Sequence, residues 1–171
     1  AARALADRLS ARFRVKLDDS ENTPGWKFSE YEMKGVPLRV ELGPRDIAEG
    51  KCVLVSRVDR SKTIVSLDGV EDAVAEKLAA IRDELYEKAL ANRQAHTYDC
   101  TSLDEIKQKL GENGDGFVRA MWCGDPECED KVKELTEVGS RCIPFDQEQL
   151  SDKCVCCGRP AKKLVYWGKA Y

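Results

Sequence analysis

Residues 122–128 read WCGDPEC and residues 153–160 read KCVCCGRP, so two clusters of cysteines stand 25 residues apart. A tetrahedral zinc site with four cysteine ligands needs two close pairs of thiolates, each on a tight turn, so that the sulfurs converge on one ion. Gly124 and Pro126 favour such a turn in the first cluster, and Gly158 lets backbone amides approach the sulfurs of the second. The pattern predicts a structural zinc site, because four thiolates leave no open coordination position for catalysis.

The second cluster holds one sulfur more than such a site needs. The first pair is Cys123 and Cys128. In the second cluster the spacing of Cys154 and Cys157 is typical of a zinc knuckle, whereas Cys154 and Cys156 would hold their sulfurs in a less usual turn. The sequence favours Cys123, Cys128, Cys154 and Cys157 as the ligands and leaves open that Cys156 replaces Cys157.

A thioredoxin-like redox pair at Cys154 and Cys157 is the alternative to zinc binding at the second cluster. Such a pair requires a helix N-terminus that lowers a thiol pKa, but Pro160 and a strand-like tail follow here. Cys142 lies beside apolar neighbours, and each cysteine outside the two clusters is predicted to be a small buried hydrophobic residue. These are Cys52, Cys100 and Cys142.

Composition places broad limits on the function. The net charge is −3, which gives no strong attraction to nucleic acid or membranes, although 28 lysines and arginines leave room for a local basic face. No apolar run approaches the ~18 residues of a membrane span. The first residues contain no signal-peptide core, so we expect a reduced, cytoplasmic environment and no disulfide framework. They also begin inside a helical pattern, so we expect further sequence upstream.

Hydrophobic spacing predicts the elements of the first part of the chain. Residues 36–43 alternate cleanly, with Leu38, Val40 and Leu42 on one face and Arg39 and Glu41 on the other. The other predicted elements of this part are a helix over 2–12, strands over 13–17, 51–59 and 63–67, a short helical or irregular turn over 27–35, and a long helix over 70–96. Strands and helices around one sheet predict an α/β unit.

A second set of elements surrounds the cysteines. The predicted elements are a helix over 103–110, a strand over 117–123, a helix over 128–139, an extended segment over 140–145 and a terminal strand over 163–171.

Residues 25–46, GWKFSEYEMKGVPLRVELGPRD, combine aromatic and charged side chains. Proteins recognise single-stranded RNA by stacking bases on aromatic rings and by hydrogen bonding to base edges. Glutamate can accept from the N1–H and N2–H₂ groups of guanine, while arginine can donate two hydrogen bonds to O6 and N7. The alternative is that the aromatic rings pack over a sheet edge and the charges are only solvated.

Residues 24–46, together with WCGDPECED at 122–130, RCIPF at 141–145, the terminal cysteine knuckle and GKAY at 168–171, resemble a known family. They are similar to the anticodon-binding domain and the C-terminal zinc domain of prolyl-tRNA synthetases of the archaeal and eukaryotic type. The resemblance implies an α/β anticodon-binding domain over residues 1–98, with a mixed sheet flanked by helices. A smaller α+β zinc-binding domain would follow over residues 99–171.

The resemblance also implies a function. The chain would recognise the tRNA(Pro) anticodon within a class II proline–tRNA ligase. An upstream catalytic domain would use ATP and magnesium, and the full enzyme would be a homodimer formed through that domain. Residues 1–171 contain none of the class II catalytic motifs, so we expect no aminoacylation by this chain alone. The alternative is a zinc-stabilised protein-interaction domain without RNA readout.

Residue roles follow from the same resemblance. Proline anticodons share two guanines, and the family pattern assigns guanine contacts to Glu32, Arg39 and Arg45. The same pattern assigns base stacking to Phe28. Glu41 and Lys34 would serve either the RNA or the fold, and Tyr171 would approach the catalytic domain.

Overall fold

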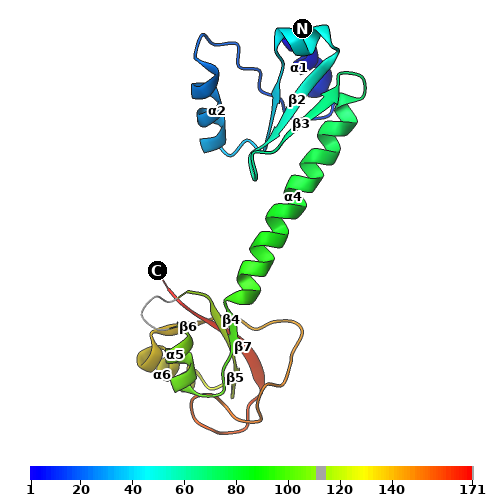
Figure 1. The fold of residues 1–171 in the computed structure, drawn as a ribbon. Helices are drawn as coiled ribbons and strands as arrows, with labels where there is room; N and C mark the ends of the chain where they lie inside the picture. Colours follow the sequence, from blue (N-terminus) through cyan, green and yellow to red (C-terminus); the bar gives the residue numbers. More distant parts are fainter. Residues whose placement is uncertain (111–114, 171) are drawn as a thin grey trace. The chain divides into compact units, whose positions relative to one another are not determined.

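The computed structural model describes residues 1–110 and 115–170. The chain divides into two compact units, Ala1–Lys88 and Ala89–Tyr171, and the division falls within the long helix α4, Val70–Ala95 (Figure 1). The sequence places the boundary after residue 98, and that boundary stays a prediction. In the part of the chain that the structure describes, no helix is both long and apolar enough to cross a membrane.

The first unit is built on a three-stranded antiparallel sheet in the order β1-β2-β3. Its strands are β1 Leu38–Glu41, β2 Lys51–Ser56 and β3 Lys62–Ser66, and its helices are α1 Ala2–Ser10, α2 Pro24–Met33, α3 Pro44–Ala48 and the start of α4. The alternation predicted for residues 36–43 is confirmed, because Leu38, Val40 and Leu42 pack against the buried core. That core is made by Leu5 and Leu9 of α1, Cys52 and Leu54 of β2, and Val70 and Val74 of α4.

Two expectations for this unit differ from the structure. Residues 13–17, for which the sequence predicts a strand, pair with no strand of the described chain. Alternation can show which side chains share a face, but it cannot supply a hydrogen-bonding partner. The sheet is also antiparallel and not mixed. β1 and β2 are joined only through the short helix α3, and β2 and β3 by a tight turn, whereas a parallel pair requires a crossover of about a dozen residues.

The mixed sheet lies in the second unit. Its strand order is β4-β5-β7-β6, in which β4 and β5 are parallel and the other pairs antiparallel. The strands are β4 Thr97–Asp99, β5 Phe117–Trp122, β6 Val138–Cys142 and β7 Lys163–Lys169. Two helices, α5 Leu103–Leu110 and α6 Pro126–Thr136, pack on this sheet. Their residues Ile106, Leu110 and Val132 belong to the same buried hydrophobic cluster as Trp167. The α/β class is confirmed.

Helix α6 is shifted from its predicted range of 128–139. It begins at Pro126 because the Asp125 side chain caps it by accepting a hydrogen bond from the Glu127 amide. It ends at Thr136, since the next residue, Glu137, has left-handed backbone geometry with a φ of 60°. Gly139, the predicted end of the helix, lies in β6 opposite Gly168.

Candidate metal centre and nucleic-acid interface

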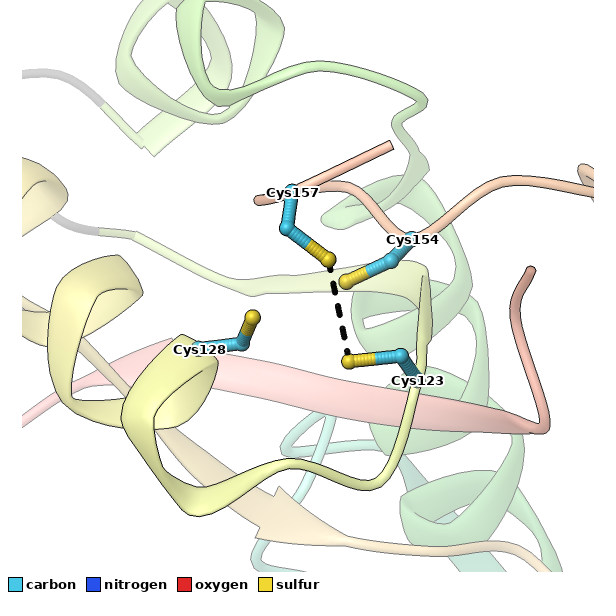
Figure 2. A group of neighbouring side chains, drawn as sticks. All are labelled: Cys123, Cys128, Cys154 and Cys157. Carbon is cyan, nitrogen blue, oxygen red and sulfur yellow. Dashed lines mark hydrogen bonds between the residues drawn. The ribbon is translucent and has the colours of Figure 1, made fainter. Parts of the chain in front are cut away.

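Four cysteine side chains from three segments converge in the second unit. Cys123 follows the last residue of β5, Cys128 lies in the first turn of α6, and Cys154 and Cys157 lie in the turn before β7. Their sulfur atoms all lie within 4.8 Å of one another, and Figure 2 shows the four side chains pointing toward a common centre. The structure therefore brings together the four sulfurs that the spacing favoured.

The distance between these sulfurs suits a shared metal ion. A tetrahedral ion with zinc–sulfur bonds of about 2.3 Å places its sulfurs about 3.8 Å apart. The Cys157 and Cys123 sulfurs are 3.8 Å apart, and all eight cysteines are free of disulfides. Cys123, Cys128 and Cys154 are buried while Cys157 is exposed, so the centre lies just beneath the surface. The donor set and its spacing fit zinc.

Backbone hydrogen bonds hold the second pair of cysteines against the first. The Val155 amide donates to the Met121 carbonyl at 2.9 Å, which fixes the 154–157 turn beside the end of β5. Within that turn, the Gly158 amide donates to the Cys154 carbonyl at 3.0 Å, and Gly158 adopts a φ of 70° that favours glycine. The turn is thus closed by residues adjacent to the cysteines themselves.

Cys156 and Cys157, the two candidates for the fourth metal ligand, have different surroundings. Cys156 is partly buried and packs against both the hydrophobic core of the unit and the buried cysteines of the cluster, but it is not among the four whose sulfurs all lie within 4.8 Å of one another. The Arg159 guanidinium donates to the Cys157 sulfur at 3.2 Å and lowers the pKa of that thiol to about 6. Burial has the opposite effect on Cys128, whose pKa it raises.

The redox alternative lacks its structural requirement. Cys154 to Cys157 form a turn, and no helix of the described residues begins at Cys154. A thioredoxin-like pair depends on a helix N-terminus to stabilise its attacking thiolate. The geometry therefore favours metal binding over thiol chemistry at this cluster.

Of the cysteines outside the two clusters, two match their prediction and one does not. Cys52 and Cys100 are buried, and burial raises the pKa of Cys52 and raises that of Cys100 to about 11. Cys142, predicted to be buried, is exposed. It ends the edge strand β6 beside a β-bulge, and its apolar neighbours Ile143 and Phe145 are exposed as well. The prediction from its apolar neighbours in the sequence, that Cys142 would be buried, is therefore wrong.

A second candidate site lies in the first unit, between α2 and β1. Thr23 caps α2 by accepting from the Trp26 amide, and Phe28 and Glu32 then share one face of this helix because they are four residues apart. Arg39 reaches this face from β1. A small hollow forms here, lined by Phe28, Tyr31, Glu32, Val36, Arg39, Val55 and Arg57.

Arg39 is the centre of this hollow. Its Nε atom donates to Glu41 at 2.9 Å and its Nη1 atom donates to Glu32 at 3.2 Å. Its guanidinium also lies 3.7 Å from the centroid of the Phe28 ring, within cation–π range. Glu41 thus orients Arg39, and a half-buried arginine is held in a fixed plane between two carboxylates and an aromatic ring.

The structure separates the four residues predicted to contact RNA. Phe28, Glu32 and Arg39 lie together, whereas Arg45 is exposed on α3 and is not among the residues found to line the hollow. Lys34 pairs with Glu30 one turn earlier in α2, at 2.6 Å. Tyr171 lies outside the described residues.

Sequence reasoning missed Arg57 as a member of this hollow. Arg57 follows β2, and its backbone amide donates to the Pro37 carbonyl at 2.9 Å. The β1–β2 register, which pairs Arg39 with Val55, brings it there. The sequence predicts a strand over residues 51–59 that contains Arg57, but nothing local indicates which residues the Arg57 side chain faces.

Comparison with known proteins gives two family matches, one in each part of the chain. Residues 1–77 match the family model described as anticodon binding domain, and residues 103–171 match the model described as the C-terminal part of prolyl-tRNA synthetase. A proline–tRNA ligase of Ruminiclostridium cellulolyticum is 56% identical over 170 residues, which is 99% of this chain and 35% of that protein. Proline–tRNA ligases of Clostridium botulinum (strain Okra) and Lachnoclostridium phytofermentans are 55% and 54% identical, each again over 99% of this chain and 35% of the relative.

The chain spans 35% of the length of these relatives. The matches follow the two units in order, with the hollow around Arg39 inside the first match and the cysteine cluster inside the second. The chain is therefore similar, over almost its whole length, to part of the proline–tRNA ligases, with an anticodon binding domain followed by a prolyl-tRNA synthetase C-terminal domain.

Proposed function

We propose that this chain recognises the anticodon of tRNA(Pro) as part of a proline–tRNA ligase. One observation carries the proposal: the hollow around Arg39 lies within residues 1–77, the segment similar to an anticodon binding domain. Its charged and aromatic groups are the ones that bind guanine edges and stack on bases. This chain spans 35% of the length of the ligases it resembles, so ligase activity would require the rest of such a protein.

The ion pairs of the hollow suggest how guanine would be read. Arg39 would donate to O6 and N7, and Glu32 would accept from the N1–H and N2–H₂ groups. In the free protein Arg39 pairs with Glu32 and Glu41, and Glu32 also pairs with Arg60, so binding would exchange charged contacts for base contacts. The Arg39 guanidinium covers one face of Phe28, so a base would stack on the opposite face or displace Arg39. Arg45 would contact RNA that extends beyond the hollow.

The test compares two arginine variants and a control in the full-length ligase that we propose contains this chain. Arg39→Ala should weaken binding of tRNA(Pro) by about 1–3 kcal/mol and reduce discrimination against transcripts with substituted anticodon guanines. Arg39→Lys should lose most of that discrimination, because a lysine cannot make the two parallel hydrogen bonds. Lys162→Ala, an exposed lysine of the second unit, should change binding little. Equilibrium binding at several salt concentrations measures all three.

Two results would contradict base readout. An equal loss in Arg39→Ala and Lys162→Ala would show that the contacts are general electrostatic attraction to RNA. Binding that ignores the anticodon sequence at every salt concentration would favour a zinc-stabilised protein-interaction domain without RNA readout.

We also propose that Cys123, Cys128, Cys154 and Cys157 hold a structural zinc ion. Their spacing and mutual distances support this assignment. The ion, when bound, would cross-link the end of β5, the start of α6 and the turn before β7. Four thiolate ligands would leave it no open position for catalysis.

The remaining parts of the proposal concern the whole ligase. An upstream catalytic domain would bind ATP and magnesium and form a homodimer in the cytoplasm, and Tyr171 would approach that domain. Residues 1–98 would form the anticodon-binding domain and residues 99–171 the zinc-binding domain. The archaeal and eukaryotic type rests on the sequence motifs, since the relatives named above carry only the name proline–tRNA ligase.

A further inference from the structure

The cysteine cluster has a charged partner outside the four sulfurs. The Arg159 guanidinium donates from Nε to the Cys157 sulfur at 3.2 Å, and its Nη2 atom lies 3.6 Å from the Cys128 sulfur and 3.9 Å from the Cys123 sulfur. The first contact is a hydrogen bond, and the two longer ones are chiefly electrostatic. One side chain thus approaches sulfurs from both cysteine pairs.

Asp125 holds this guanidinium in place. Its Oδ2 atom accepts a hydrogen bond from Arg159 Nη2, while its Oδ1 atom accepts from the Glu127 amide at 3.1 Å and caps helix α6. Asp125 lies in the chain between the first two cysteines, and Arg159 lies two residues after Cys157. The pair therefore joins the two halves of the cluster, and Asp125 is also the cap that starts the helix carrying Cys128.

The backbone of Arg159 takes part in the same arrangement. Its carbonyl accepts a hydrogen bond from the Cys154 amide at 2.8 Å, which closes the knuckle. The main chain of Arg159 therefore positions Cys154, while its side chain approaches the sulfurs of the other three cysteines of the cluster. A substitution at position 159 keeps this main-chain bond and removes only the side-chain contacts.

Charge explains what such a side chain would do. Four thiolates around one divalent ion carry a net charge of −2, and three of these cysteines are buried, where uncompensated charge is costly. A guanidinium within about 4 Å opposes that charge, and hydrogen bonds from it draw electron density from the sulfur. Its planar fork reaches the Cys157 sulfur and the Asp125 carboxylate at once, which a single ammonium group does less well.

We infer that Arg159, anchored by Asp125, is a positioning and charge-compensating residue for the cysteine cluster and determines how firmly the cluster retains its metal. This inference rests on the proposed zinc site. Outer-shell partners of metal ligands typically change metal affinity by about 10–100-fold when they are removed. Loss of the Arg159 side chain should therefore lower metal affinity, whereas loss of an ordinary surface arginine should leave it unchanged.

The experiment measures zinc affinity and zinc release in the full-length protein, purified under reducing conditions, by competition with a chromophoric chelator. Arg159→Met should lower the affinity about 10–100-fold and speed release, and Arg159→Lys should fall between this variant and the wild type. Asp125→Asn keeps a good helix cap but loses the anchoring charge, so it should shift affinity in the same direction by less. The rate at which iodoacetamide alkylates Cys157 in the zinc-loaded protein should rise in Arg159→Met.

Lys162→Met is the matched control, since Lys162 is exposed, stands three residues after Arg159 and loses the same charge. It should stay within about twofold of the wild type in affinity, far below the outer-shell effect. Equal affinity in Arg159→Met and the wild type, or an equal loss in Lys162→Met, would overturn the inference. Arg159→Lys retains the charge and the stem, so it decides the question if Arg159→Met does not fold. A wild-type protein that binds no zinc would refute the metal site itself, and the inference with it.

Discussion

Two arginines, Arg39 and Arg159, illustrate how single side chains give this chain its chemistry. Arg39 lies between two carboxylates and the Phe28 ring, and Arg159 lies between sulfurs and the Asp125 carboxylate. Each uses several donors of one planar group at the same time, which lysine does not reproduce. At both positions a substitution of arginine by lysine therefore tests whether the planar guanidinium, and not only its positive charge, is needed.

At the residue scale, the assignment of the fourth sulfur can be tested directly. Cys157→Ser should release zinc, because a serine hydroxyl replaces one of the four sulfurs that converge. Cys156→Ser should retain zinc, since the Cys156 sulfur is not among the four that converge, and its main effect should be a modest loss of stability because the side chain packs against the core and the cluster. Elemental analysis of both purified variants against the wild type measures the difference. Metal loss in Cys156→Ser alone would show that the ligand set is misassigned.

Helix α2 links the fold of the first unit to its candidate RNA site. It has no buried residues of its own, so its position depends on its cap and on contacts made by its charged and aromatic face. The Thr23 hydroxyl accepts from the Trp26 amide at a long 3.4 Å. Because Phe28 and Glu32 project from this helix, its stability determines how well the hollow is formed.

At the element scale, removal of that cap should loosen α2. Thr23→Ala should lower the free energy of unfolding by about 0.5–1 kcal/mol, the lower part of the range for N-cap substitutions, because the bond is long. Thr23→Ser, which retains the hydroxyl, should stay close to the wild type. Urea denaturation followed by circular dichroism compares the two variants. If the two behaved alike, the Thr23 side chain would not contribute to this helix.

The whole chain consists of two units with separate hydrophobic cores. The core of the first unit is built on α1, β2 and α4, and the core of the second surrounds Trp167. The buried cysteines of the cluster pack together beside Trp122 in the second unit. Metal should therefore affect the two units differently.

At the scale of the whole molecule, removal of metal should destabilise one unit only. Chelation should increase hydrogen exchange in β5, β7 and α6, because zinc would join these segments and metal-binding energy becomes folding energy. Amides of β1 and β2 should exchange at an unchanged rate. Hydrogen exchange with mass spectrometry, with and without chelator, resolves these segments. An equal increase in both units, or no change in either, would contradict a structural metal confined to the second unit.

Most of the helices and strands, and the four cysteines whose sulfurs converge, could be predicted from the amino-acid sequence. Helical and alternating periodicity predicted α1, β1, β2, β3, α4, α5, β5 and β7, because the spacing of apolar residues directly reflects which side chains share a face. The spacing of the cysteines predicted the four sulfurs that lie within 4.8 Å of one another. It could do so because a tight turn brings the two cysteines of a close pair together independently of the rest of the fold.

Which distant residues meet depends on how the strands pair and how the elements pack. Strand register brought Arg57 to the hollow around Arg39, the edge position of β6 left Cys142 exposed, and the absence of a pairing partner in the described chain left residues 13–17 without a strand. The contact of Arg159 with sulfurs of both pairs likewise depends on how the two turns pack. Local pattern depends on neighbours along the chain, whereas these contacts depend on pairing and packing between segments that no short stretch of sequence contains.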